Sequence, residues 1–227
     1  LEDQGLLDEA VISYHKALAI KPDYAEAHNN LGNALHELGK LDDAVASCQK
    51  AIAIKPDFAE AHNNLGNTFK ELGKLDEAAA SHYKALAINP DYAEAHNNLG
   101  TALEDQGLLD EAVISYHKAL TIKPDFAEAH TNLGNAFQEL GKLDEAVTSY
   151  HKALAISSDF AEAHNSLGNI FIKLGKLNEA VTSFHSALAI KPDLAEAHTN
   201  LGNALKELGK MDEAVTSYHK ALAINPD

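Results

Sequence analysis

Asparagine and histidine are the residues of this sequence whose types and spacing could do chemistry. The run AHNNLGN and its close variants recur along the chain, which contains 13 histidines. A carboxamide offers both a donor and an acceptor, so it can pair with the N–H and C=O of a peptide backbone. An imidazole can bind a metal ion or transfer a proton. The amides could therefore form a backbone-binding surface, and the histidines could form a metal or catalytic site.

The spacing of these residues is periodic. Proline occurs at 22, 56, 90, 124, 192 and 226, in steps of 34 or 68 residues, and Ser158 stands at the missing place. The chain is therefore expected to be a single repeat array, 1–227, with Ala25 as position 1 of its first whole unit. Its units are 1–24 (partial), 25–58, 59–92, 93–126, 127–160, 161–194 and 195–227. Because it starts inside a unit, we expect a fragment of a longer array.

Each unit is predicted to be a helical hairpin. In 25–58, apolar residues recur with helical spacing from Ala27 to Leu38 and mark one stripe of a first helix, which Gly39 ends. A second stripe runs from Leu41 to Ile52 and stops before a proline. One hairpin cannot bury its own stripes, so neighbouring hairpins must stack into a solenoid.

The small residues carry a resemblance to a known family. Leu31-Gly32, Ala44, Ala51 and Pro56 fall at the spacing of the tetratricopeptide repeat, and the match recurs along the whole chain. The resemblance implies an all-α, right-handed superhelical solenoid of antiparallel helix-turn-helix repeats. It also implies a concave groove, lined by the first helices, that holds extended peptides. The AHNNLGN run resembles the repeats that precede the catalytic domain of O-linked N-acetylglucosamine transferase.

Three columns of amides are expected on the exposed side of the first helices, opposite the buried stripe. Asparagine is a mediocre helix former, so a row of them on one face needs a reason. The resemblance assigns position 6 to a peptide backbone, while position 9 is the better candidate for bonds between repeats; some amides could instead simply face water. Position 6 holds Asn30, Asn64, Asn98, Asn132 and Asn200; position 5 holds Asn29, Asn63, Asn97 and Asn165; position 9 holds Asn33, Asn67, Asn135, Asn169 and Asn203.

The acidic residues are expected to stabilise helix N-termini and to select the side chains of a ligand. The chain has 34 acidic and 18 basic side chains and a net charge of -16. Most acids stand at expected helix starts, where Asp23 and its equivalents would cap free N–H groups. The others, including Glu71 and Glu139, lie at the variable positions 12 and 13 and are predicted to select ligand side chains, with relaxed constraint on surface positions as the alternative. Ile172 is predicted to be an exposed apolar anchor at the same place, with local repacking as the alternative.

Several classes of function are excluded by the same residues. Histidines within a column are 34 residues apart, so stacked hairpins would hold them about 10 Å apart, too far to share a metal ion. We therefore expect no metal and no cofactor, and we expect the position-4 histidines to pack between helices with a hydrogen bond. The single cysteine, Cys48, is expected to be a buried thiol. Every candidate catalytic group is copied in each unit, so no catalytic residue and no enzyme is predicted.

The partner is predicted to be a protein. A strongly acidic chain without arginine is unsuited to nucleic acid, and no apolar run is long enough to span a membrane. We therefore expect a cytoplasmic, non-catalytic module that binds an extended peptide, neutral or basic, through an asparagine ladder. Two alternatives remain open: the substrate-recognition arm of a larger glycosyltransferase, and a scaffold that self-associates end to end.

Overall fold

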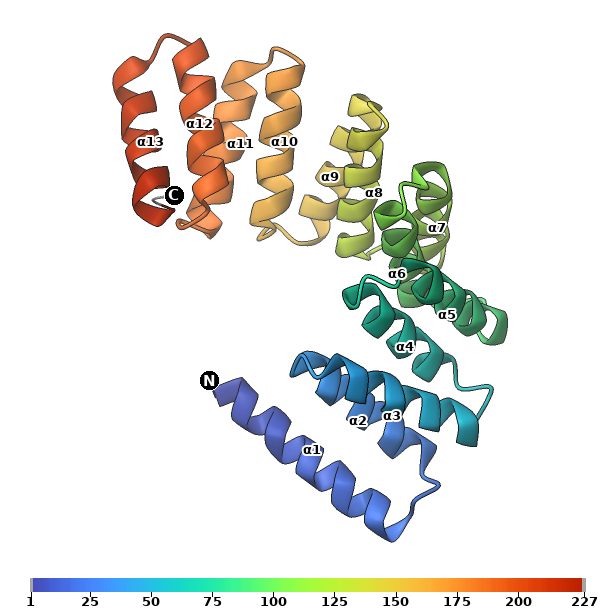
Figure 1. Cartoon of the computed structure of the whole chain (residues 1–227). Coiled ribbons are helices and arrows are strands. Elements are labelled where there is room, and N and C mark those ends of the chain that lie inside the picture. The colour runs from blue at the N-terminus through green and yellow to red at the C-terminus, as the bar shows by residue number, and fades with distance from the viewer. Residues whose placement is uncertain (1, 226–227) are drawn as a thin grey trace. The chain divides into compact units, whose positions relative to one another are not determined.

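The repeats are helical throughout the part of the chain that the structure describes. A computed structural model describes the backbone of residues 2–225 and the side chains of residues 5–225. Within this range the chain forms 13 α-helices and no strand (Figure 1). Their bounds are α1 Glu2–Ile20, α2 Ala25–Glu37, α3 Leu41–Ile54, α4 Ala59–Glu71, α5 Leu75–Ile88, α6 Ala93–Asp105, α7 Leu109–Ile122, α8 Ala127–Glu139, α9 Leu143–Ile156, α10 Ala161–Lys173, α11 Leu177–Ile190, α12 Ala195–Glu207 and α13 Met211–Ile224.

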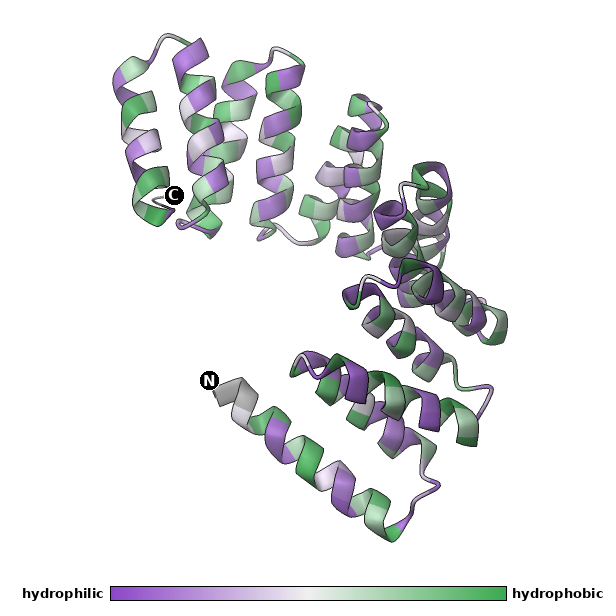
Figure 2. Ribbon diagram, in the orientation of Figure 1, coloured by the Kyte–Doolittle hydropathy of each residue, from purple (hydrophilic) through white to green (hydrophobic). Residues whose placement is uncertain are grey.

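The predicted hairpins are confirmed. The even-numbered helices are the first helices of the units and the odd-numbered helices from α3 onward are the second helices. Hydrophobic and hydrophilic residues alternate around each helix in stripes, as Figure 2 shows. The helices fall into two compact units, Leu1–Pro124 and Asp125–Asp227, and each is considered by itself.

A glycine ends each first helix with a defined turn. Gly39 has φ of 70°, a conformation that only glycine adopts without strain. The N–H of Lys40 donates to the C=O of Leu35 at 2.9 Å, and the N–H of Gly39 donates to the C=O of His36 at 2.8 Å. These two bonds form a Schellman motif, and equivalent bonds follow α4, α6, α8, α10 and α12. The turn reverses the chain so that each second helix packs against its own first helix.

Small residues bring the two helices of a hairpin together. Ala44 and Ala51 of α3 are completely buried: Ala44 packs in one cluster with residues of α2, and Ala51 in another with residues of α2 and of the following repeat. The glycine at position 8 lies under the side chain at position 24: a Cβ added to Gly134 would lie 2.9 Å from the Tyr150 ring. Real Cβ atoms do not approach so closely, so the backbone of the first helix reaches this distance only with glycine.

The predicted aspartate caps are wrong. The residue that precedes each first helix is aromatic or leucine, Tyr24 before α2 for example, and no side chain caps the N-terminus of any helix from α2 to α13. Asp23 lies one residue earlier, in the turn. The first turns still carry acids such as Glu26, Asp42 and Asp43, whose charge suits the positive end of the helix dipole.

One sequence occurs twice in the chain with two backbone structures. Residues 1–24 and 103–126 differ at only two positions. In the later copy, Gly107 has φ of 76° and separates α6 from α7, whereas α1 runs unbroken from Glu2 to Ile20 and includes Gly5. The later copy packs as a hairpin with the rest of α6, whereas α1 packs against α2, the first helix of the next repeat. The local sequence therefore permits the turn, and packing against a complete first helix stabilises it.

Candidate functional site

Asparagines link consecutive first helices in the first compact unit. The side-chain N–H of Asn64 on α4 donates to Oδ1 of Asn29 on α2 at 3.0 Å. One repeat later, the side-chain N–H of Asn98 on α6 donates to Oδ1 of Asn63 on α4 at 3.2 Å. Each link, called a rung below, joins position 6 of one repeat to position 5 of the repeat before it.

The expectation that position 5 lies on the exposed face is wrong. Asn29, Asn63 and Asn97 are 7%, 4% and 1% exposed, because these side chains point toward the neighbouring repeat. Oδ1 of Asn63 is also within 3.1 Å of Nδ1 of His82 on α5, so this side chain links α4 to both α5 and α6. A buried amide that is satisfied in this way holds its neighbours in fixed orientations.

Position 6 remains on the first-helix face, which we define as the exposed side of the first helices carrying positions 2, 6, 9 and 13. Asn64 and Asn98 are half-buried. One amide N–H of each is used in a rung, while Oδ1 has no partner among the described residues. Each rung thus orients an amide and leaves its acceptor and second N–H for another molecule. Asn30 of α2 is exposed; in the second compact unit, Asn132 of α8 and Asn200 of α12 are half-buried at the same position of their own helices.

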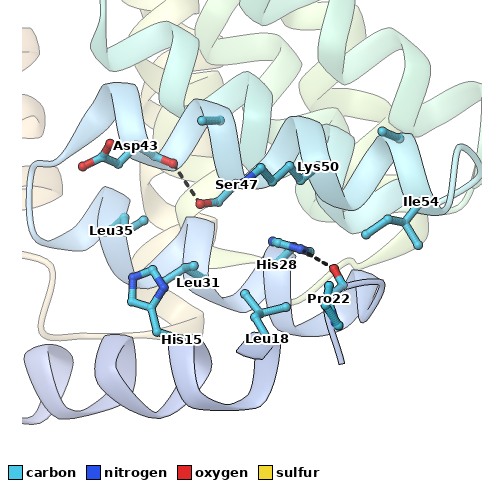
Figure 3. Close-up of a pocket in the computed structure, with 12 residues that line it drawn as sticks. His15, Leu18, Pro22, His28, Leu31, Leu35, Asp43, Ser47, Lys50 and Ile54 are labelled. Atoms are coloured by element: carbon cyan, nitrogen blue, oxygen red, sulfur yellow. Dashed lines mark hydrogen bonds between the residues drawn. The ribbon is translucent and has the colours of Figure 1, made fainter. Parts of the chain in front are cut away.

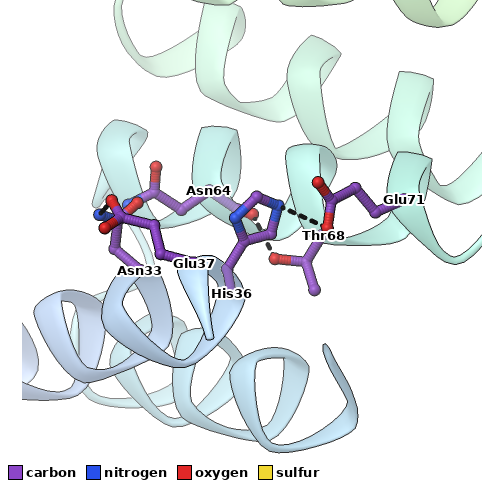
Figure 4. Close-up of polar contacts among 6 residues, drawn as sticks. All are labelled: Asn33, His36, Glu37, Asn64, Thr68 and Glu71. Carbon is purple, nitrogen blue, oxygen red and sulfur yellow. Dashed lines mark hydrogen bonds and ion pairs between the residues drawn. The ribbon is translucent and has the colours of Figure 1, made fainter. Parts of the chain in front are cut away.

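Position 9 does not form the predicted bonds between repeats. Asn33 donates to Glu37 of its own helix at 2.9 Å (Figure 4). Asn135 accepts from the Tyr150 hydroxyl at 2.6 Å, within its own hairpin, and Asn203 accepts from Tyr218 in the same way. Asn67 is half-buried. The asparagine–asparagine bonds between repeats come instead from positions 5 and 6.

Polar and charged side chains at positions 12 and 13 contact one another between consecutive repeats. Nε2 of His36 lies 3.3 Å from a carboxylate oxygen of Glu71, as Figure 4 shows. In the next pair, Nζ of Lys70 lies 3.7 Å from the Asp105 carboxylate. Such partly exposed pairs contribute about 0–1 kcal/mol each. They offset part of the acidity on the first-helix face; Glu139 of α8, at the equivalent position 13, is exposed.

The glutamates at position 2 differ from one another in their partners. Glu26 pairs with Lys55 at 3.8 Å and Glu94 pairs with Lys123 at 3.1 Å, in each case across the base of the same hairpin. In the intervening repeat the position of the lysine is held by Asn89. Glu60 has no cation beside it among the ion pairs of the described residues.

The second compact unit has a different arrangement. Ser166 stands at position 6, and Asn165 donates to Glu196 of the next repeat at 3.2 Å, to which Asn200 also donates at 3.4 Å. Ile172 is not an exposed anchor: it is half-buried and packs against the core of Phe184, Leu201 and Leu205. The alternative of local repacking therefore describes it better.

The position-4 histidines have a structural role, as predicted. Nε2 of His28 lies 3.0 Å from the carbonyl oxygen of Pro22 (Figure 3), and His62, His96 and His198 make the equivalent bond. The ring therefore carries its proton on Nε2, and burial lowers the pKa of His96, opposed by this bond. Across the described residues, no group of three His, Cys, Asp or Glu side chains could hold a metal ion.

Two side chains at position 24, Cys48 and His82, have strongly shifted pKa values. Cys48 is completely buried, as predicted, and burial raises its pKa to about 12. His82 is also completely buried; burial, with a smaller effect from Lys70, lowers its pKa to about 4. The thiol is inert at neutral pH and the imidazole is neutral, so neither group is suited to nucleophilic or acid–base chemistry.

Grooves on the other side of the hairpins were missed in the sequence. One of about 640 Å³ lies between α1 and α3 over α2, with Leu18, His28, Leu31 and Ile54 in its walls (Figure 3). Equivalent positions line grooves of about 650 Å³ between α5 and α7 and about 620 Å³ between α11 and α13. Exposed Tyr83 and Ile114 add apolar surface to the α5–α7 groove. Tyr83 stands at a position that is otherwise histidine or glutamine, and this departure was the signal available in the sequence.

Family models place the chain among known proteins. Models described as TPR repeat match residues 3–39, 32–73, 66–107, 102–141, 134–175 and 168–209, and one described as tetratricopeptide repeat matches residues 195–227. The chain belongs to the tetratricopeptide repeat family. Proteins of this family generally mediate protein–protein interactions and generally are non-catalytic scaffolds. A search of curated proteins found no match.

Solved structures show the same fold. The crystal structure of MamA has 28% sequence identity and a TM-score of 0.67, over 71% of this chain and 95% of that chain. A structure of Pseudomonas aeruginosa pilF has 22% identity and a TM-score of 0.81, over 89% and 92%. YrrB, described as a TPR protein with an unusual peptide-binding site, has 23% identity and a TM-score of 0.63, over 81% and 95%. The latter two are evidence of fold alone.

In the described part of the chain, every helix is too short or too polar to cross a membrane.

Proposed function

We propose that the chain binds an extended peptide segment along its first-helix face, with the position-6 asparagines gripping the peptide backbone. The observation that carries this proposal is the pair of rungs: Asn29 and Asn63 orient Asn64 and Asn98, whose Oδ1 atoms lack a partner among the described residues. An amide with a free acceptor and a free N–H can pair with the N–H and C=O of one peptide unit. YrrB, with its unusual peptide-binding site, is a precedent within the same fold.

The charge of the first-helix face favours a neutral or basic segment. Glu37, Glu60, Glu71 and Asp105 are exposed on it, and Lys70 is the cation paired with one of them. Complementary charge raises the rate of association and disfavours acidic competitors. The same reasoning argues against a ligand that presents a terminal carboxylate.

The proposal is tested with displayed random 12-residue peptides selected on the wild-type chain. Selected peptides are synthesised and titrated by calorimetry into wild type and the Asn64→Ala/Asn98→Ala variant. Loss of two backbone grips at about 1 kcal/mol each is expected to weaken binding about tenfold or more. Gln49→Ala, an exposed amide on α3, is the matched control and should change nothing.

Equal affinity for wild type and the double variant would contradict the ladder. Because the Asn64 and Asn98 side chains also bond to neighbouring repeats, thermal melts accompany each titration. A variant that remains folded at the titration temperature isolates the effect on the ligand.

The ladder would also suit the substrate-recognition arm of a larger glycosyltransferase. That hypothesis rests on the resemblance of the AHNNLGN run alone. A reading frame that continues into a glycosyltransferase domain would support it.

A further inference from the structure

The spacing of the rungs restricts the conformation of a bound peptide. Asn64 and Asn98 occupy the same position on α4 and α6, one repeat apart, and each is oriented by the same kind of bond. Helices packed side by side lie about 8–10 Å apart. A peptide gripped at both rungs must therefore present the same backbone groups, facing the same way, about once every 8–10 Å.

We infer that the segment bound by this face has polyproline II conformation and is gripped at every third residue, with basic side chains recurring at that spacing. The inference rests on the proposed function and narrows its ligand to one class.

Only one common extended conformation has the required period. Polyproline II has three residues per turn and rises about 3.1 Å per residue, so equivalent groups face the same side every ~9.3 Å. A β-strand repeats its facing every two residues, about 6.6–6.8 Å, and residues three apart on a strand face opposite sides. The backbone of polyproline II makes no internal hydrogen bonds, so its polar groups are free to pair with the amides of the ladder.

The ladder also restricts where proline can stand in the ligand. An asparagine that pairs with both the N–H and the C=O of a peptide needs a residue with an N–H, which proline lacks. The gripped residue of each triplet is therefore not proline, while the two others can be. Prolines at those two places fix the conformation in advance and lower the entropic cost of binding.

One carboxylate on the first-helix face indicates which side chain the ligand carries in its three-residue repeat. Glu60 is exposed and lies four residues before Asn64 on α4, so the two side chains share one face of the helix. Its equivalents Glu26 and Glu94 are paired with lysines, but the corresponding position in its repeat is Asn89. Glu60 is thus a carboxylate beside a rung, and a lysine or arginine of the ligand would supply the cation that this repeat lacks.

Three synthetic 12-residue peptides test the inference. The first is (Pro-Pro-Lys)₄, with lysine at every third residue. The second has the same composition with lysines at residues 4, 6, 10 and 12, so that it keeps the conformation and the charge but loses the register. The third, (Ser-Gly-Lys)₄, keeps charge and register without the preset conformation. Circular dichroism confirms polyproline II in the first two, and calorimetry measures binding to wild type, Asn64→Ala/Asn98→Ala and Glu60→Gln.

The first peptide is expected to bind wild type about tenfold more tightly than each of the others, since a register error or a flexible chain loses at least one grip. Asn64→Ala/Asn98→Ala should remove the preference for register, and Glu60→Gln should weaken the first peptide severalfold while the chain stays folded. Gln49→Ala on α3 should leave every affinity unchanged.

The outcomes separate this inference from the proposed function. Two results would overturn the inferred polyproline II register while leaving the asparagine ladder supported: equal binding of the two proline peptides, or tighter binding of (Ser-Gly-Lys)₄. In both cases the affinities must still be lower for Asn64→Ala/Asn98→Ala than for wild type. Two other results would overturn both the inference and the proposed function. One is that the asparagine substitutions leave the affinities unchanged; the other is that none of the three peptides binds at millimolar concentration.

Discussion

At the scale of the residue, His82 and Asn63 show how one substitution in a repeat is accommodated. His82 occupies position 24, where the equivalent side chains are Cys48, Tyr116, Tyr150 and others. Nδ1 of the ring lies 3.1 Å from Oδ1 of Asn63, while Nε2 is buried without a hydrogen-bond partner. The neutral imidazole therefore donates from Nδ1, and protonation would place a second N–H where nothing accepts it.

The stability of the chain should therefore fall with acid before its carboxylates titrate. The pKa of His82 is lowered from 6.5 to about 4, so protonation favours the unfolded state. Its contribution is complete above pH ~6.5 and is lost as pH falls toward about 4, amounting to about 3 kcal/mol. Urea unfolding of wild type and His82→Tyr between pH 4 and 7 measures the loss.

The tyrosine variant provides the matched control for this titration. The new hydroxyl would reach Asn67 as that of Tyr150 reaches Asn135, so the variant should fold. The difference in unfolding free energy between the two proteins should grow as pH falls. If the unfolding free energies of the two proteins changed in parallel with pH, protonation of His82 would not be coupled to unfolding.

The helical period separated the exposed positions of the first helices from the buried ones only in part. It placed position 6 on the exposed side, where Asn64 and Asn98 are half-buried, but it placed the buried position 5 there as well. A residue at the edge of that face is exposed in an isolated helix but becomes buried when the first helix of the next repeat packs beside it. The 3.6-residue period does not determine the angle at which the two helices pack. The ion pair of His36 with Glu71 was missed for the same reason.

At the scale of the element, the two copies of one sequence separate local preference from packing. The hairpins and their glycine turns were predictable, because the apolar stripes and the left-handed glycine are local signals. The unbroken α1 was not, since Gly5 and Gly107 have almost identical neighbours in sequence. Gly107 is held at φ of 76° by the packing of a complete first helix, whereas Gly5 lies in a helix with open space around it.

The same substitution should therefore have opposite effects in the two copies. Gly5→Ala should stabilise the chain by about 0.5–1 kcal/mol, because alanine is the better helix former and meets no neighbour. Gly107→Ala should destabilise it by about 1–2 kcal/mol, because the left-handed conformation strains a residue with a Cβ. Thermal and urea unfolding of the two variants measure both signs, and a stabilising Gly107→Ala would refute the packing explanation.

At the scale of the whole molecule, the net charge of -16 is spread over many helix starts. The sequence predicted this location correctly but attributed it to side-chain caps, which the N-termini of α2 to α13 lack. The acids act instead through the helix dipole and a few exposed ion pairs such as Lys55 with Glu26. The remaining excess of like charge disfavours the compact state, since each added repeat brings further negative charge.

Added salt should therefore stabilise the chain. Raising NaCl from about 10 mM to about 0.3 M shortens the Debye length from roughly 30 Å to below 10 Å and screens repulsion between repeats. We expect an increase of about 1 kcal/mol in the free energy of unfolding, measured from urea midpoints. Glu60→Gln/Glu9→Gln should reduce the increase, and a decrease with salt in wild type would mean that ion pairs outweigh repulsion.

Each rung is divided between two neighbouring repeats, with the acceptor in one and the donor in the next. Asn29 serves Asn64, and Asn63 in turn serves Asn98. A unit copied by gene duplication thus carries a donor at one junction and an acceptor at the other, and inserting a whole unit restores an unbroken row. Recombination between near-identical units can therefore lengthen or shorten this surface in single steps, without new mutations at the junctions.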